Sequence, residues 1–221
     1  AAVWAAHDRV ARDLLPVWRG REIDKTDGML LLFDRAADAV RYALAYHHAL
    51  AALPVPLQAR AGLHVGPVIL RENSAEDVAR GAKPLEVDGL AKPTAARVMS
   101  LARGGQTLLT TEARAALNED ADGGALQFAS HGHWVVKGLA EPIELFEVGE
   151  DPSSFLAPVA SEKLYRVVQA DGRWLPVQQV PNNLPELPNA FIGRERELND
   201  LRSLLGINIG RKAGLRKDTA N

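Results

Sequence analysis

The side chains that could do chemistry in this chain lie in a few short segments. Asp27, within the run 25–28 of Lys-Thr-Asp-Gly, offers a carboxylate of the kind that binds hard divalent cations, although an Asp before Gly is by itself typical of a turn. His131 and His133 lie two residues apart on an expected strand, so they share a face and could chelate a metal. No third ligand accompanies them, and we therefore interpret both as surface residues.

The remaining histidines suggest structural roles. His47 and His48 are adjacent on an expected helix, so they point to different faces and form no paired metal site. His64 lies between two apolar residues of an expected strand and is interpreted as a core or edge histidine satisfied by a backbone carbonyl. Arg97, on a later helix, is by itself as consistent with a solvated cation as with a catalytic one.

The composition excludes several classes of protein. The 221 residues include no cysteine, which removes disulfides, thiol nucleophiles and Cys-ligated zinc. The formal net charge of -2 gives no general basic footprint for nucleic acid. No apolar run is long enough to span a membrane and no signal peptide is visible, so the expected location is the cytoplasm.

Helices and strands alternate over the first two thirds of the chain, which predicts an α/β sandwich with helices on one face of a largely antiparallel sheet. Asp34 is expected to cap the second helix, and the polar residues 71–84 are expected to loop over the surface. The predicted helices are 1–19, 36–52, 93–101 and 111–117. The predicted strands are 21–24, 29–33, 57–65 with a continuation at 68–70, 106–110, and a pair within 123–145 that turns near Gly138 and Pro142.

Composition changes after about residue 150, where proline becomes frequent and periodicity weak. We interpret 149–188 as a Pro-rich linker with one hairpin, at 163–168 and 174–177. Residues 189–221 read as a helix followed by a disordered tail.

Five segments occur in an order and spacing that resembles the class III nucleotidyl cyclase catalytic domain. The resemblance covers about residues 1–148 and implies a ferredoxin-like βαββαβ core with an added C-terminal hairpin. The segments are GREIDKTDGMLLLF (20–33), AADAVRYALAYHHAL (36–50), RAGLHVGPV (60–68), VDGLAKPTAARVMSLARGGQTLLT (87–110) and HGHWVVKGLAEPIELFEV (131–148).

The resemblance implies an enzyme that converts ATP or GTP into a 3′,5′-cyclic nucleotide and pyrophosphate, with sites formed between two protomers of a homodimer. Mg²⁺ or Mn²⁺ would hold the triphosphate through two Asp residues. Asp27 matches the second of these, and the strand that carries the first would precede Ala1. Arg97 matches the arginine that offsets charge on the transferring phosphoryl group.

Other positions depart from the family pattern. Glu86 matches the acidic residue that reads the base, and Lys25 lies near the base-reading lysine, whose own position is Ile23. Pro93 occupies the place of an Asn that contacts the ribose, and it has no side-chain amide. The family's triphosphate-binding lysine falls at Leu139, so Lys137 is interpreted as structural or as a surface residue.

The segment 188–198 resembles the start of a STAND-type ATPase module, although no Walker A loop follows it. Two functions therefore stay open. The first is a signalling domain with cyclase activity that is weak or absent in this chain. The second is a catalytically dead module for dimerisation or nucleotide sensing that regulates a downstream ATPase. Neither implies nucleic acid or a membrane as partner.

Overall fold

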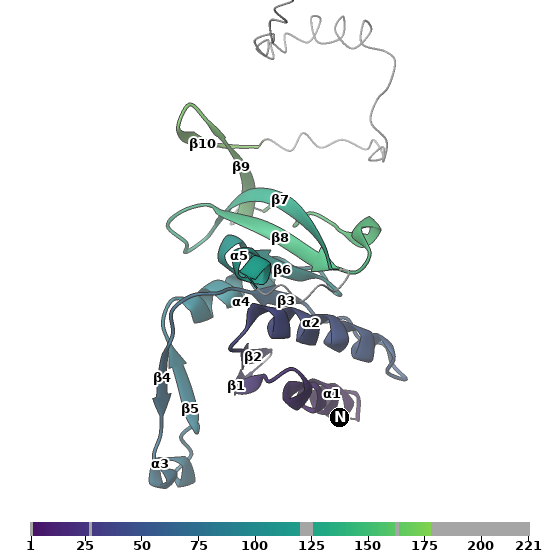
Figure 1. Cartoon of the computed structure of the whole chain (residues 1–221), viewed down its shortest axis with the longest axis vertical. Coiled ribbons are helices and arrows are strands. Elements are labelled where there is room, and N and C mark those ends of the chain that lie inside the picture. The colour runs from purple at the N-terminus through teal and green to yellow at the C-terminus, as the bar shows by residue number, and fades with distance from the viewer. Residues whose placement is uncertain (1, 27, 120–125, 162–163, 178–221) are drawn as a thin grey trace, which may run out of the picture. The chain divides into compact units, whose positions relative to one another are not determined.

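Six strands form the main sheet of the protein. The structure is a computed structural model that describes residues 2–26, 28–119, 126–161 and 164–177. The strand order is β10-β9-β7-β8-β6-β3, in which β3 and β6 run parallel and every other pair is antiparallel (Figure 1). The strands are β3 (Ala61–Leu63), β6 (Thr107–Thr110), β7 (Gln127–Val136), β8 (Ile143–Gly149), β9 (Leu164–Ala170) and β10 (Arg173–Pro176).

Helices pack on both faces of this sheet. Successive residues of β6 point to opposite faces: Leu108 joins a cluster with Val98 of α4 (Ala91–Leu101), and Leu109 joins a cluster with Val40 of α2 (Ala36–Ala51). The helix α5 (Thr111–Glu119) belongs to the second cluster through Ala113. The mixed α/β fold is confirmed, whereas the prediction that helices cover one face is wrong.

The helix α4 lies unusually close to the edge strand β3. A Cβ built on Gly62 would lie 2.1 Å from the backbone nitrogen of Met99 and 2.5 Å from its Cα. Only glycine permits this approach, because no other residue lacks the Cβ. The contact fixes the distance of α4 from the sheet.

The N-terminal elements are α1 (Ala2–Val17) and a hairpin of β1 (Arg21–Lys25) with β2 (Met29–Leu32), which confirms the predicted hairpin. The expected cap of α2 is wrong. Arg35 is its N-cap residue, and the Asp34 carboxylate instead accepts a hydrogen bond from the Arg21 guanidinium at 2.9 Å. A bidentate ion pair joins the residues just after α1 to α2. Arg19 donates to the buried carboxylate of Asp38 from Nη2 at 2.6 Å and from Nε at 3.0 Å.

The residues 71–84, expected to loop over the surface, contain the end of one strand and a short helix, and they form part of a two-stranded arm. The strands β4 (Ile69–Glu72) and β5 (Leu85–Asp88) pair in antiparallel fashion, and the short helix α3 (Ala75–Ala79) joins them. Ser74 caps α3 by accepting a hydrogen bond from the Asp77 amide. Lys83 ties the arm to the N-terminal hairpin, through a 2.6 Å ion pair with Asp24.

A strap of residues 150–161 follows β8 and leads to the hairpin of β9 and β10, which confirms the predicted hairpin. This hairpin is not free, because β9 pairs with β7 and so extends the main sheet. A 3₁₀ turn at Pro152–Ser154 opens the strap, and the ring of Phe155 lies against Gly149. None of the described helices has the length and apolar character needed to cross a membrane. The proposed ATPase segment at 189–221 lies outside the described residues.

Candidate functional site

Arg97 lies on α4 with its guanidinium directly above the turn between β7 and β8. A Cβ on Gly138 would lie 2.7 Å from Nη2 of Arg97 and 3.1 Å from its Cζ. Gly138 has φ +87°, and the turn is closed by a 3.0 Å hydrogen bond from the Leu139 amide to the Val136 carbonyl. The side chain of Arg97 therefore rests on bare backbone, in a place that only glycine leaves open.

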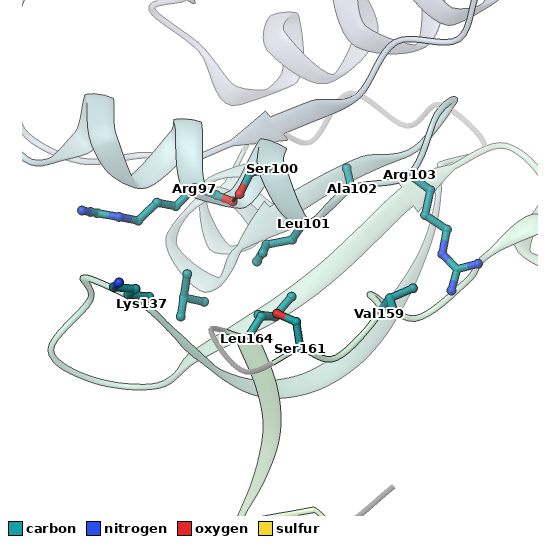
Figure 2. A pocket seen from close by; sticks show the side chains of 10 residues that line it. Arg97, Ser100, Leu101, Ala102, Arg103, Lys137, Val159, Ser161 and Leu164 are labelled. Carbon is teal, nitrogen blue, oxygen red and sulfur yellow. Dashed lines mark hydrogen bonds between the residues drawn. The ribbon is translucent and has the colours of Figure 1, made fainter. Parts of the chain in front are cut away.

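Arg97 and Lys137 border a cavity of about 470 Å³ (Figure 2). Figure 2 shows both cationic side chains at one end of the cavity and Arg103 at the other. Its walls are mainly apolar, with Leu101, Val136 and Leu164 among them, and Val159 and Ser161 of the strap also line it. A cavity of this size matches those that hold small ligands.

The charges of Arg97 and Lys137 are not neutralised within the part of the chain that the structure describes. Neither side chain forms an ion pair or a hydrogen bond with a described residue, whereas Lys25, Arg71 and Lys83 all pair with carboxylates. Two neighbouring cations beside one cavity favour a ligand with more than one negative charge. Lys137 is exposed, in agreement with its interpretation as a surface residue, and the turn at Gly138 brings it to the same cavity as Arg97.

Lys25 is engaged with the N-terminal helix. Its ammonium contacts the carboxylate of Asp8, which His7 also contacts at 3.0 Å. The Lys25 hydrogen bond and then that of His7 lower the pKa of Asp8, so this carboxyl is charged at neutral pH. The contact with Asp8 engages one of the three N–H donors of the Lys25 ammonium, and a base edge would have to share the ammonium with this carboxylate.

Glu86 lies on β5 of the arm and is engaged there as well. Its carboxylate accepts a 3.0 Å hydrogen bond from Asn73 and contacts the guanidinium of Arg71. The Asn73 hydrogen bond, followed by the charge of Arg71, lowers the pKa of Glu86. The ion pair of Lys83 with Asp24 brings this strand beside β1. The expected base-reading residues Lys25 and Glu86 therefore lie on two neighbouring strands.

Pro93 is the third residue of α4 and is half-buried. A proline fits there because the first amides of a helix have no intrahelical acceptor. It lies one turn before Arg97, so the two residues share a face of the helix. Proline has no side-chain amide, so position 93 cannot hydrogen-bond to a ligand beside Arg97 in the way that an Asn could.

The described residues do not supply a complete metal site. No three histidine, aspartate or glutamate side chains converge as ligands within residues 2–26, 28–119, 126–161 and 164–177. Asp27, the expected metal ligand, lies outside them. The need for Mg²⁺ or Mn²⁺ therefore stays a prediction that rests on the resemblance, and no chemical step is derived through a metal.

The histidines of the last strands do not form a pair. A bulge at Ser130–Gly132 interrupts the alternation of β7, and the side chain of His131 is buried against Glu147 at 2.8 Å. The ring of His133 lies against Trp174, with centroids 4.7 Å apart. The expectation that both are surface residues is wrong for His131. His64 is half-buried and contacts the Thr110 hydroxyl at 2.9 Å, rather than a backbone carbonyl.

No family model matches the chain, and no curated protein matches it by sequence. Solved structures do match. An adenylate cyclase of Trypanosoma brucei, solved in its monomeric state, aligns with a TM-score of 0.60 and 21% identity over 71% of this chain and 83% of that chain. The adenylyl cyclase CyaB of P. aeruginosa gives 0.56 and 15%, over 70% and 84%. The guanylate cyclase domain of RhGC from Catenaria anguillulae, in complex with GTP, gives 0.53 and 17%, over 67% and 80%. The chain thus has the fold of class III adenylate and guanylate cyclase catalytic domains.

Proposed function

We propose that this domain is a nucleotidyl cyclase-type signalling module that binds ATP or GTP between two copies of the chain and converts it slowly to the cyclic nucleotide. The observation that carries the proposal is the placement of Arg97. On a fold shared with cyclases, its guanidinium is held above Gly138 at a cavity, beside Lys137 and without an acidic partner among the described residues. A triphosphate presents the multiple negative charge that such a pair of cations attracts.

Each residue would then act in a defined way. Arg97 would offset the charge that develops on the transferring phosphoryl group, a role for which a preorganised guanidinium is suited. Lys25 would donate to an acceptor on the base edge, and Glu86 would accept from a donor there. Asp27 would hold Mg²⁺ or Mn²⁺, whose chemistry is to neutralise the triphosphate and lower the pKa of the ribose 3′-hydroxyl.

Three features of the site favour slow turnover. Pro93 offers no amide to the ribose, Lys25 shares its ammonium with Asp8, and Glu86 shares its carboxylate with Arg71 and Asn73. One lost contact to the transition state typically costs about 3–4 kcal/mol, or roughly 100- to 1000-fold in rate. Together these features would place the activity far below that of an intact site.

The same features support a second function, a catalytically dead module that senses nucleotide or dimerises to regulate a downstream ATPase. Pro93 is the specific observation in its favour, because its ring removes a ribose contact while α4 keeps its shape. Nucleotide binding without cyclic product would distinguish this module from an enzyme.

The decisive experiment measures cyclic product from this chain with Mn²⁺ and either ATP or GTP, at protein concentrations where sedimentation shows dimers. Arg97→Ala and Asp27→Ala should each abolish product, whereas Arg60→Ala, an exposed cation outside the site, should not. Pro93→Asn restores an amide, and we expect it to raise the rate by at least tenfold.

Calorimetric titration with each nucleotide runs in parallel. Binding without product, in both the wild type and Pro93→Asn, would establish the sensing module and contradict the enzyme. Absence of both binding and product would contradict the enzyme and the nucleotide sensor and leave a dimerisation scaffold.

A further inference from the structure

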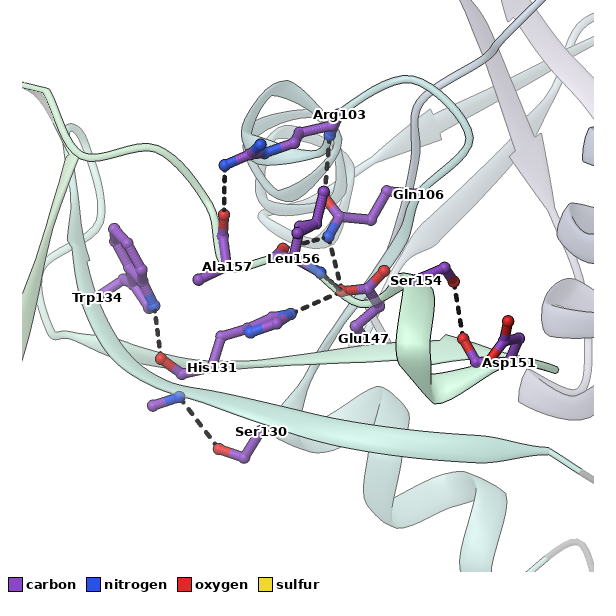
Figure 3. A network of polar contacts seen from close by, with 11 residues as sticks. Arg103, Gln106, Ser130, His131, Trp134, Glu147, Asp151, Ser154, Leu156 and Ala157 are labelled. Atoms are coloured by element: carbon purple, nitrogen blue, oxygen red, sulfur yellow. Dashed lines mark hydrogen bonds and ion pairs between the residues drawn. The ribbon is translucent and has the colours of Figure 1, made fainter. Parts of the chain in front are cut away.

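A buried carboxylate fastens the strap of residues 150–161 to the main sheet (Figure 3). Glu147 of β8 is 5% exposed, and its Oε2 accepts three hydrogen bonds. The donors are Gln106 Nε2 at 2.7 Å, His131 Nε2 at 2.8 Å and the Leu156 amide at 3.1 Å. The strap thus contributes one of the three donors.

The segment between α4 and β6 holds the strap at two more points. The side-chain amide of Gln106 also donates to the Leu156 carbonyl at 2.6 Å, and its side-chain oxygen accepts a hydrogen bond from the backbone amide of Arg103 at 2.9 Å. The Arg103 guanidinium donates to the Ala157 carbonyl at 3.1 Å. We call Glu147, Gln106 and His131 the latch. It joins the sheet, the chain just after α4 and the backbone of the strap.

The strap is also the outer wall of the cavity beside Arg97. Val159 and Ser161 line that cavity, two and four residues beyond the last latched residue, Ala157. Val159 stays within about 7 Å of Ala157, because each residue spans at most about 3.5 Å. Ser161 is held separately, by backbone hydrogen bonds with Leu164 of β9 at 2.5 and 3.1 Å. The latch therefore acts on the part of the wall that Val159 forms.

Burying a carboxylate costs free energy because the charge loses its hydration. Apolar packing in its place is often as stable, whereas a hydrogen-bonded network restricts the arrangement of its partners. The Glu147 network therefore ties the strap to one set of hydrogen-bond partners. Phe155, packed against Gly149, adds an apolar anchor to the same segment.

We propose that Glu147 is a positioning residue for the anion site at Arg97 and Lys137. Its carboxylate latches the strap, and the latched strap holds Val159 in the wall of the cavity that would take a polyphosphate. The inference rests on the proposed function, because it assumes that this cavity takes a polyanion. It predicts that release of the latch weakens polyphosphate binding although no residue that contacts the ligand has changed.

The test uses inorganic tripolyphosphate, which has no base, together with the full chain. Glu147→Gln keeps the size of the side chain and removes its charge. Glu144→Gln on the same strand is the matched control, because the Glu144 carboxylate accepts a hydrogen bond from the Ser130 hydroxyl and lies outside the latch. We expect Glu147→Gln to weaken tripolyphosphate binding about five- to tenfold, within the usual range of coupling between sites. The Leu156 amide should exchange with solvent faster in that variant and unchanged in the control.

A reciprocal measurement needs no variant, so it decides the matter even if Glu147→Gln does not fold. If the two sites are coupled, tripolyphosphate must slow exchange at the Leu156 amide of the wild-type chain. Faster exchange in Glu147→Gln with unchanged affinity would overturn the coupling and leave the proposed function intact. Binding of nucleotide but not of tripolyphosphate would overturn the anion site. Absence of both would contradict the proposed function itself.

Discussion

Replacing Gly138 with alanine tests whether bare backbone under Arg97 sets the position of its guanidinium. The new Cβ would lie 2.7 Å from Nη2, and ordinary contact requires about 3.5–4.0 Å. The end of a flexible side chain can give way, so Arg97 should move by roughly 1 Å rather than unfold the turn. Displacements of this size can cost about 100-fold in a reaction that depends on orientation.

The substitution also strains the backbone, and Gly105 separates the two effects. Gly138 and Gly105 have φ of +87° and +83°, but a Cβ on Gly105 meets nothing within 4 Å. Each alanine should therefore cost about 1–2 kcal/mol of stability from the left-handed conformation alone. Only the substitution at position 138 touches Arg97.

Urea unfolding of both variants, followed by tryptophan fluorescence, gives the cost in stability, and tripolyphosphate titration gives the cost in binding. We expect similar losses of stability and a loss of affinity of at least fivefold confined to Gly138→Ala, approaching that of Arg97→Ala. Equal affinities in the two alanine variants would refute the positioning of Arg97 by the turn.

Three further substitutions test the fold around the site. Gly62→Ala places a Cβ 2.1 Å from the Met99 backbone, and no side-chain rotamer can relieve this clash. Urea unfolding should therefore show that the free energy of unfolding falls by about 3 kcal/mol or more. A decrease below about 1 kcal/mol would contradict the close packing of α4 against β3. Arg19→Gln removes a bidentate guanidinium from the buried carboxylate of Asp38. The same assay should show that the free energy of unfolding falls by about 2 kcal/mol. An unchanged free energy of unfolding would mean that the ion pair is not formed. Burial lowers the pKa of His47 below 6.5, so the unfolded chain takes up a proton at a higher pH than the folded chain does. Stability should therefore fall as the pH drops below about 6.5, and His47→Gln should make that decline shallower; an unchanged slope would show that His47 does not contribute.

The sequence predicted most elements because their signals are local. The Asp-Gly turn placed the first hairpin, and the apolar periodicity placed α2 and α4. The failures came from contacts between distant residues. Arg21 takes the carboxylate of Asp34 away from the helix cap, and the side of the sheet that each helix covers depends on strand order rather than on any local pattern.

His131 shows how one residue can defeat a correct strand prediction. Alternation with a period of two places His131 and His133 on one face. The bulge at Gly132, with φ +77°, shifts the register and turns His131 into the interior beside Glu147. A glycine between two histidines of a strand was the one local signal of this bulge.

The candidate site was predicted in its residue types but not in its partners. Asp8 lies 17 residues from Lys25 in the sequence, so nothing local shows that it occupies the ammonium. Lys137 was set aside because the family's lysine falls at Leu139. The turn at Gly138 nonetheless places Lys137 beside Arg97, where a prediction based on motif position alone has no means of finding it.

The helix α4 connects the features that determine the position of Arg97. Its middle is held against β3 by the contact at Gly62, and the side chain of Arg97 is held by Gly138. The residues just after its end are held to the strap through Arg103. The helix has 11 residues, or about 16 Å, so these three contacts lie within or just beyond one short element. Arg103 thus links the strap to the chain that leaves this helix, whereas Gly62 and Gly138 set the position of Arg97 itself.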